Sequence, residues 1–135
     1  MDHKFVSKNW GYEIWIENNA DYCCKHLHVV PNMQCSVHYH KNKTETFYII
    51  EGELLLFYLD RYVNIHYESA EGVMTWDKYK KSIVLCKGES FTIPPRTLHT
   101  FTSNLSYPCD FIEASTEHKD EDSYRIRLSG AFNER

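Results

Sequence analysis

The chain has 135 residues, enough for one domain spanning 1–135 with a single hydrophobic core. A formal net charge of −4 argues against a nucleic-acid partner, because binding phosphates requires a clustered basic surface. No apolar run approaches the roughly 20 residues of a membrane span. The N-terminus also lacks the apolar core of a signal peptide, so we expect a cytoplasmic protein with no membrane partner.

Short stretches of alternating apolar and polar residues recur along the chain, separated by turn signals. The aromatic content of 15% also favours strands. The stretch from Asp60 to Lys81 has no clear period, and we expect a hairpin with a long connection there. Only a turn or so of helix is expected, near Glu117–Tyr124. The pattern predicts an all-β sandwich or barrel. In chain order, the expected strands cover residues 11–18, 25–31, 36–40, 45–50, 53–59, 82–86, 90–94, 99–103 and 109–116.

The segment around residues 35–52 carries most of the chemistry. His38 and His40 are two residues apart in an expected strand, so both side chains point to the same face. Glu45 begins the next strand. Two imidazoles and a carboxylate facing an apolar interior are costly unless a divalent cation compensates them. His99, which follows the Pro94–Pro95 break, joins this group if the second half of the chain folds back.

Two spacings resemble those of a known family. His38-x-His40-x4-Glu45-x6-Gly52, within about 32–52, resembles the first motif of the cupins, and Gly88-x5-Pro94-x4-His99, within about 88–103, resembles the second. The resemblance implies a single-domain cupin, a double-stranded β-helix or jelly-roll barrel. It also implies that the metal ligands are His38, His40, Glu45 and His99. Asn32 and Arg96 stand where the motifs usually have glycine.

Three imidazoles and one carboxylate suit one divalent ion, and Zn, Mn, Fe, Co and Ni fit about equally. Four protein ligands leave one or two coordination positions open, as a catalytic site requires. The five cysteines form no C-x-x-C pair, which argues against a disulfide framework or a thiolate site. Cys35 is expected on the opposite face of the strand from His38.

The two ends of the chain suggest a reaction. KNWGYE near the start, and an Ile-Glu followed by Asp122-x-x-Arg125 near the end, resemble the cupin part of type II phosphomannose isomerases and related sugar-isomerase cupins. This resemblance implies a sugar or sugar-phosphate aldose–ketose isomerase. A base must then move a proton between neighbouring carbons. Glu113 is the first candidate and Glu13 and Lys25 follow, although an ion pair between Glu113 and Arg125 or a lysine is an equally good interpretation.

Cations near the motifs could bind the substrate. Arg96, just before His99, is the first candidate for an anionic group, and Lys41 and Lys43 are weaker ones. A small carbohydrate is the expected substrate. Tyr48 alternates away from Glu45 and is expected outside the barrel, and the aromatic-rich strands fit a homodimer.

Other functions remain possible for the same ligands. The first is a cupin that binds metal or carbohydrate without catalysis, and the second is a metal-dependent dioxygenase. Metal-free sugar-nucleotide epimerases of this fold are disfavoured, because all four ligand positions are filled.

Overall fold

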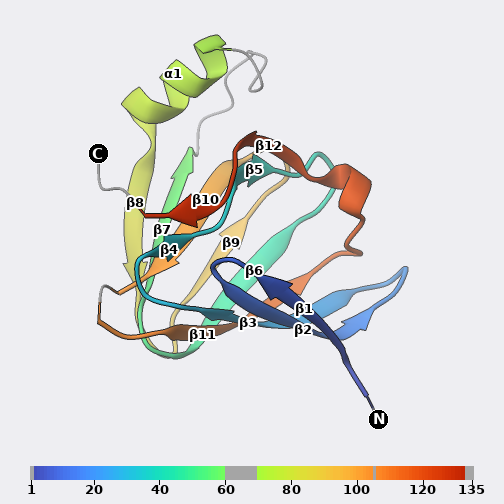
Figure 1. Ribbon diagram of the computed structural model, residues 1–135. Helices are drawn as coiled ribbons and strands as arrows, with labels where there is room; N and C mark the ends of the chain where they lie inside the picture. The colour runs from blue at the N-terminus through green and yellow to red at the C-terminus, as the bar shows by residue number, and fades with distance from the viewer. Residues whose placement is uncertain (1, 60–69, 105, 133–135) are drawn as a thin grey trace.

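The computed structural model describes residues 2–59, 70–104 and 106–132. They form two antiparallel sheets that face each other (Figure 1). Sheet A has six strands in the order β1 (Lys4–Lys8), β2 (Gly11–Asn18), β3 (Cys23–Val29), β11 (Cys109–Ser115), β6 (Glu45–Glu51) and β9 (Ser90–Ile93). Sheet B has seven: β12 (Tyr124–Arg127), β5 (Val37–Tyr39), β10 (Leu98–Ser103), β4 (Met33–Gln34) and β13 (Gly130–Ala131), with β7 (Leu54–Leu59) on β10 and β8 (Lys81–Leu85) on β7.

The all-β prediction is confirmed, and each of the nine expected strands has a counterpart in the two sheets. The expected turn of helix near the end of the chain is η1, a short 3-10 helix at Asp120–Asp122. The pattern missed β1, β4, β12 and β13, of which two have only two residues each. Such short strands carry too few alternations to be recognised.

The expected hairpin after Asp60 is wrong in its second half. Residues 70–79 form the helix α1 (Ala70–Tyr79), whereas residues 60–69 lie outside the described part of the chain. The helix packs through Trp76, which is 1% exposed, and Arg127 of β12 forms a two-fold ion pair with Asp77 at 2.6 and 2.7 Å. One buried aromatic in ten residues gives almost no helical period, so the pattern could not reveal it.

The core lies between the sheets, where the inward side chains of alternating strands meet. Phe47, Phe101 and Phe111 form an aromatic cluster with ring centroids 4.9–5.8 Å apart. Phe47 also lies beside His99, with ring centroids 6.3 Å apart, so the aromatic core borders the buried histidines.

The two motif positions that lack glycine adopt the left-handed backbone conformation that glycine usually provides. Asn32 has a φ of 65° and Arg96 a φ of 63°, both in the left-handed region. The tight turns expected at Gly52 and Gly88 are present, with φ values of 82° and 86°. A Cβ on Gly52 would lie 2.4 Å from the carbonyl oxygen of Pro108, so this turn requires glycine.

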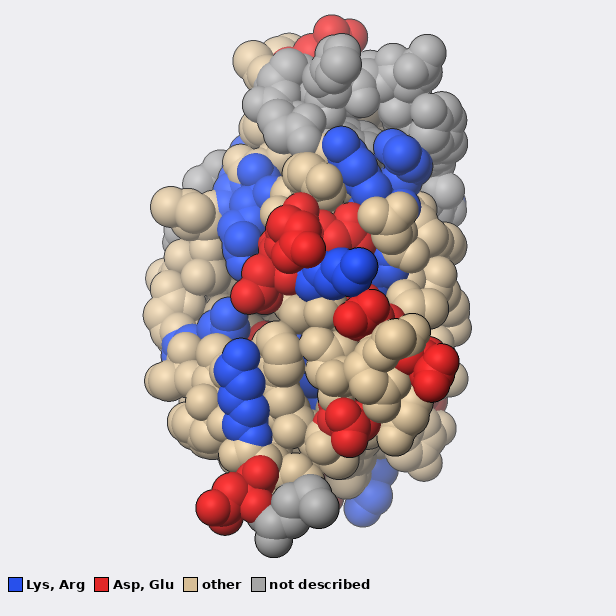
Figure 2. All heavy atoms as spheres, turned by 90° about the vertical axis from the view of Figure 1, so that its right-hand side faces the viewer, with Lys and Arg blue, Asp and Glu red and all other residues tan. Residues whose placement is uncertain are grey.

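Charges of both signs are mixed over the side of the molecule that carries η1 and the tips of β2 and β3, with no broad region of one sign (Figure 2). Within the described residues, the helix is too short and too polar to cross a membrane.

Candidate metal centre

Strand pairing brings distant histidines together. His38 of β5 lies directly opposite His99 of β10, and His40 follows the end of β5. Glu45 begins β6 in the other sheet, so its carboxylate approaches the histidines across the interior. One ligand atom from each of these four residues lies within 4.8 Å of the other three. They form a group that is able to bind a metal ion.

The three imidazoles share one hydrogen-bonding pattern. The Nδ1 atoms of His38, His40 and His99 lie 2.8–3.0 Å from the backbone oxygens of Ser36, Asp122 and Thr97, respectively. A carbonyl oxygen can only accept a hydrogen bond, so each Nδ1 donates, and in the neutral imidazole Nε2 then carries the lone pair that can bind a metal. Backbone contacts of this kind fix the tautomer of metal-binding histidines.

Two inward atoms have no hydrogen-bond partner among the described residues. They are Oε1 of Glu45 and Nε2 of His99, 2.7 Å apart and both fully buried. Nε2 of His40 lies 3.8 Å from the same carboxylate oxygen. Buried polar atoms are nearly always satisfied, and a cation between these atoms would satisfy all of them. The donor set therefore fits a divalent metal ion.

Electrostatics keeps His38, His40 and Glu45 in the form that binds metal. Burial lowers the pKa of His40 to about 4, and burial together with His99 and His40 lowers the pKa of His38 well below its usual value. Burial alone would raise the pKa of Glu45, but His99, Lys43 and His40 lower it well below its usual value. Neutral imidazoles and an ionised carboxylate are the metal-binding forms of these side chains.

Lys43, one of the weaker candidates for a substrate contact, lines the cavity next to this group and is a buried bridge between two carboxylates. Its Nζ lies 3.2 Å from Oε2 of Glu45 and 2.7 Å from Oε2 of Glu113. Burial lowers the pKa of Lys43, but Glu113 and Glu45 outweigh burial and raise it above its usual value. Because Lys43 occupies Oε2 of Glu45, the other oxygen of that carboxylate is directed to the histidines.

The three candidate bases lie on the inner face of sheet A. Glu113 is opposite Lys25 in the strand pairing, and burial raises the pKa of Glu113, although Lys43 and Lys25 oppose this effect. Glu13 accepts a hydrogen bond from Nε1 of Trp15 at 2.9 Å and lies 3.7 Å from Nζ of Lys25. Lys25 also lies over the Trp15 ring, 4.0 Å from its centroid. Of the two interpretations of Glu113, the ion pair is present, and its partner is Lys43 rather than Arg125.

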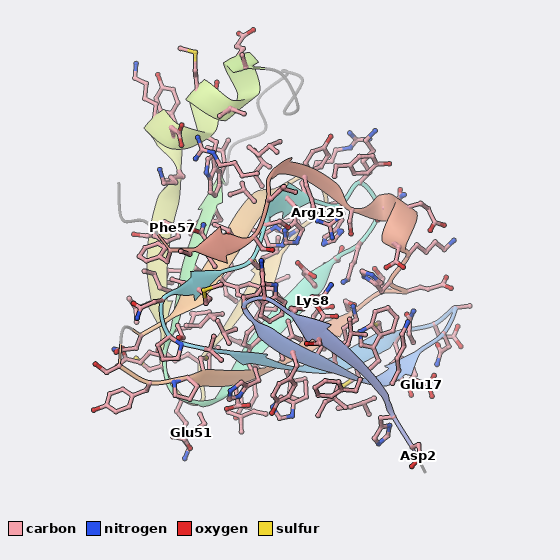
Figure 3. All side chains as sticks on the ribbon, in the orientation of Figure 1. Asp2, Lys8, Glu17, Glu51, Phe57 and Arg125 are labelled. Carbon is pink, nitrogen blue, oxygen red and sulfur yellow. The ribbon has the colours of Figure 1, made fainter. Side chains whose placement is uncertain are left out.

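A cavity of about 350 Å³ opens beside these residues. It is lined by the bases, by three of the four metal-binding residues, by Lys43 and by two further cations, Lys8 of β1 and Arg125 of β12, both labelled in Figure 3. Arg125 is the strand partner of His38, which places it on the inner side of β12. Neither cation forms a side-chain ion pair or hydrogen bond with any residue that the structure describes.

Two predicted substrate contacts do not line this cavity. Arg96 is exposed in its left-handed turn, and its backbone N–H donates to the oxygen of His40 at 2.6 Å. Nζ of Lys41 lies over the Tyr124 ring, 4.4 Å from its centroid. Asp122 is a structural residue, because its carboxylate accepts the backbone N–H groups of residues 41–43 and holds the loop between His40 and Glu45.

Sequence reasoning missed His118 and misplaced Cys35. Nζ of Lys43 donates to Nδ1 of His118 at 3.1 Å, and Nε2 of His118 donates to Asp120 at 2.9 Å. Burial, with help from Lys25 and Lys43, lowers the pKa of His118 to about 4. Cys35 faces the same cavity as His38, because the strand breaks between β4 and β5 and its alternation is lost. Burial raises the pKa of the Cys35 thiol to about 12, which disfavours the thiolate that binds metals.

Comparisons with known proteins agree with this geometry. A family model described as Cupin matches residues 23–132. The D-lyxose ketol-isomerase of Thermofilum sp. (strain ex4484_79) is 32% identical over 129 residues, which cover 85% of this chain and 69% of that protein. The D-lyxose/D-mannose isomerase of Thermosediminibacter oceani is 28% identical over 124 residues, covering 86% of this chain and 67% of that protein.

Solved structures share the fold. Oxalate decarboxylase from Bacillus subtilis superimposes with a TM-score of 0.71 at 13% identity, covering 93% of this chain and 30% of that chain. The capsular polysaccharide assembling protein CapF from Staphylococcus aureus gives a TM-score of 0.74 at 16% identity, covering 95% of this chain and 32% of that one. This chain therefore spans about a third of these larger chains, and at such low identity the likeness shows the fold alone.

Proposed function

We propose, from the premise that this chain belongs to the cupin family, that it is a metal-dependent aldose–ketose isomerase acting on a small sugar. The observation that carries the proposal is a metal-binding group and a buried carboxylate, Glu113, on the wall of one cavity. The names of the two relatives, both sugar isomerases, support the same reaction.

Interconversion of an aldose and a ketose moves a proton between two adjacent carbons while negative charge develops on oxygen. A bound divalent cation stabilises that developing charge. His38, His40, Glu45 and His99 would hold it. The remaining work, which is to bind the sugar and to move the proton, falls to other side chains in the cavity.

Glu113 is the proposed base. Its Oε2 is held by Lys43, whereas Oε1 makes no hydrogen bond to any residue in the described part of the chain. Burial raises its pKa, which makes the carboxylate a stronger proton acceptor than an exposed one. Lys43 keeps the carboxylate ionised and in a fixed orientation before the proton arrives, and it stabilises the shared charge afterwards. Glu13 and Lys25 are the alternatives on the same wall.

The cavity suits a monosaccharide. Its volume of about 350 Å³ lies within the range of about 300–1,000 Å³ of small-molecule sites. Trp10 and Trp15 form part of its wall, and Lys8 and Arg125 offer donors to the oxygens of a sugar. We propose a free aldose of the lyxose or mannose type as the substrate, by analogy with the named relatives.

A phosphorylated aldose is the second candidate. Lys8 and Arg125 favour it, because two cations without partners among the described residues could bind a phosphate. Lys8 and Arg125, rather than Arg96, would then bind the anionic group.

The five free cysteines support placing the reaction in the cytoplasm.

The test begins with the metal. The purified protein is analysed for its metal content, stripped with a chelator and reloaded separately with Zn, Mn, Fe, Co and Ni. Each form is then given lyxose, mannose, xylose and mannose 6-phosphate, and ketose formation is measured. We expect ketose from at least one free aldose, only with metal. No turnover on any of these sugars by the metal-loaded protein would contradict the proposal and favour a binding protein, whereas iron-dependent oxygen uptake would favour a dioxygenase.

A further inference from the structure

A second cavity, of about 320 Å³, lies on the other side of sheet B from the metal centre. Val37, which lines it, precedes His38 on β5, and Thr100, which also lines it, follows His99 on β10. Neighbouring residues of a strand face opposite sides of the sheet, so these two strands carry metal ligands on one face and the second cavity on the other. The two cavities have no lining residue in common.

Three aromatic side chains lie on the wall of the second cavity. Helix α1 contributes Trp76, and β7 contributes Phe57, which Figure 3 shows on the opposite side of the molecule from Lys8 of the first cavity. Phe132 stacks on Phe57, with ring centroids 5.9 Å apart and planes inclined by 28°. The volume lies within the range of about 300–1,000 Å³ of small-molecule sites. Because aromatic pairs are stabilised beyond the burial of their area, these rings favour an aromatic ligand.

Most polar groups that line this cavity are already bound within the protein. Nε2 of Gln34 donates to Oγ1 of Thr100 at 3.1 Å, and that hydroxyl donates to the backbone oxygen of Cys35 at 2.9 Å. Arg127 and Asp77 neutralise each other in their two-fold ion pair. These groups therefore need no polar atom of a ligand to satisfy them.

Lys80 is the charged lining residue that no carboxylate neutralises within residues 2–59, 70–104 and 106–132. Its Nζ donates to the backbone oxygen of Asp77 at 3.2 Å, and an ammonium group has three donors, so two remain. The same atom lies 6.0 Å from the centroid of the Trp76 ring, so the cation adjoins the aromatic wall. With Lys80 and Arg127 positive and Asp77 negative, the lining carries a charge of +1, which favours a ligand with one negative charge.

We propose that the second cavity binds a small aromatic carboxylate. The ring of the ligand packs against Phe57, Trp76 and Phe132, and its carboxylate accepts hydrogen bonds from Lys80. The ligand and a substrate in the first cavity are separated by sheet B, so both can be bound at once. The inference is independent of the proposed function, because no residue of the first cavity takes part.

The test uses indole-3-acetate as the probe and indole-3-acetamide as its neutral counterpart. Binding to the whole protein, stripped of metal so that no carboxylate can bind an ion in the first cavity, is measured by titration calorimetry. We expect a Kd below about 1 mM for indole-3-acetate. Lys80→Met should raise this Kd about five-fold and leave the binding of the neutral probe unchanged. Lys78→Met is the matched control, because Lys78 is exposed on the same helix and does not line the cavity; it should change Kd by less than about two-fold.

A second variant, Ala131→Trp, fills the cavity from a residue of its lining and should raise Kd at least about ten-fold. Circular dichroism verifies that each variant is folded, and if Ala131→Trp does not fold, the two lysine variants decide. No binding of indole-3-acetate at up to about 5 mM overturns the proposal. Binding that Lys78→Met and Lys80→Met weaken equally, that survives in folded Ala131→Trp, or that requires metal overturns it as well.

Discussion

Two neighbouring rows of sheet A, one on each face, reverse the usual pattern of charged residues outside and apolar residues inside. The inner row at Glu113 reads Lys4, Trp15, Lys25, Glu113, Phe47 and Phe91 across the six strands. The outer row, one residue away on each strand, contains no Lys, Arg, Asp or Glu and reads Phe5, Ile14, His26, Ile112, Tyr48 and Ser90. Lys25 and Glu113 are 2% and 6% exposed, whereas Tyr48 and Phe5 are half exposed or more.

This contrast indicates that the charged residues of the inner row are placed by the chemistry of the cavity that they line. Burying a charge costs free energy unless it is paired, and the buried lysines and glutamates have partners: Lys43 bridges Glu45 and Glu113, and Lys25 lies beside Glu13. If the inner residues serve chemistry and the outer ones do not, then substitutions on the two faces will affect different measurements.

The largest effect is expected from Glu45→Gln. The substitution keeps the shape of the side chain but removes the charge that balances a divalent cation between three neutral imidazoles. We expect the metal content to fall well below one ion per chain and turnover to fall by about 10³-fold or more. Elemental analysis of the dialysed protein and ketose formation measure the two effects, and full metal content in the variant would contradict the assignment of Glu45 as a ligand.

The next largest effect is expected from a substitution that removes the proposed base but keeps the metal ligands. Glu113→Gln removes the proton acceptor, so turnover should fall by about 10²–10⁴-fold while the metal remains bound. Glu17→Gln is the matched control, because it makes the same change on the outer face of sheet A and should leave turnover within about two-fold. Normal turnover in Glu113→Gln would exclude Glu113 as the base and move attention to Glu13 and Lys25.

A third substitution tests how much the buried ion pairs on the inner face contribute to the free energy of unfolding. Lys43→Met leaves the buried carboxylates of Glu45 and Glu113 facing each other without the ammonium between them. Breaking a buried ion pair typically costs about 3–5 kcal/mol, so the free energy of unfolding of the metal-free protein should fall by about 3 kcal/mol. Chemical denaturation gives the value, and an unchanged midpoint would show that the carboxylates do not need Lys43.

The sequence predicted the strands and the metal-binding group because both depend on local spacing. His38 and His40 share a face by simple alternation, and the family resemblance supplied Glu45 and His99. The outward position of Tyr48 followed from the same alternation and is confirmed by its 50% exposure.

Contacts between distant segments could not be predicted in this way. Lys43 meets Glu113 and His118 across 70 and 75 residues, and no local pattern encodes those pairs. The cations Lys8 and Arg125 reach the cavity only because β1 and β12 form edges of the two sheets. The inward turn of Cys35 depends on a break between two very short strands, which alternation alone places on the wrong side.

The inner histidines should make the metal-free protein sensitive to acid. The pKa values of His40 and His118 are lowered from 6.5 to about 4 in the folded chain, and unfolding restores the usual value. Between pH 6.5 and 4 the unfolded state therefore binds more protons, so stability falls as pH falls through this window. Thermal unfolding at several pH values measures the slope. His118→Gln should make it shallower, and a slope that His118→Gln leaves unchanged would contradict the burial of a neutral His118.

The smallest effect is expected on the outer face, where a polar contact is exposed to water. The hydroxyls of Thr46 and Thr92 are 2.9 Å apart on neighbouring strands of sheet A. Thr46→Val removes this hydrogen bond but keeps the β-branched shape, and water can satisfy Thr92, so the free energy of unfolding should change by less than about 0.5 kcal/mol. Turnover and metal content should not change, because Thr46 points away from the cavity although it is the neighbour of Glu45. Denaturation and activity assays on this one variant thus test whether Thr46, on the outer side of β6, is independent of the metal site although it directly follows Glu45. A loss of metal from Thr46→Val would show that the faces are coupled through the strand.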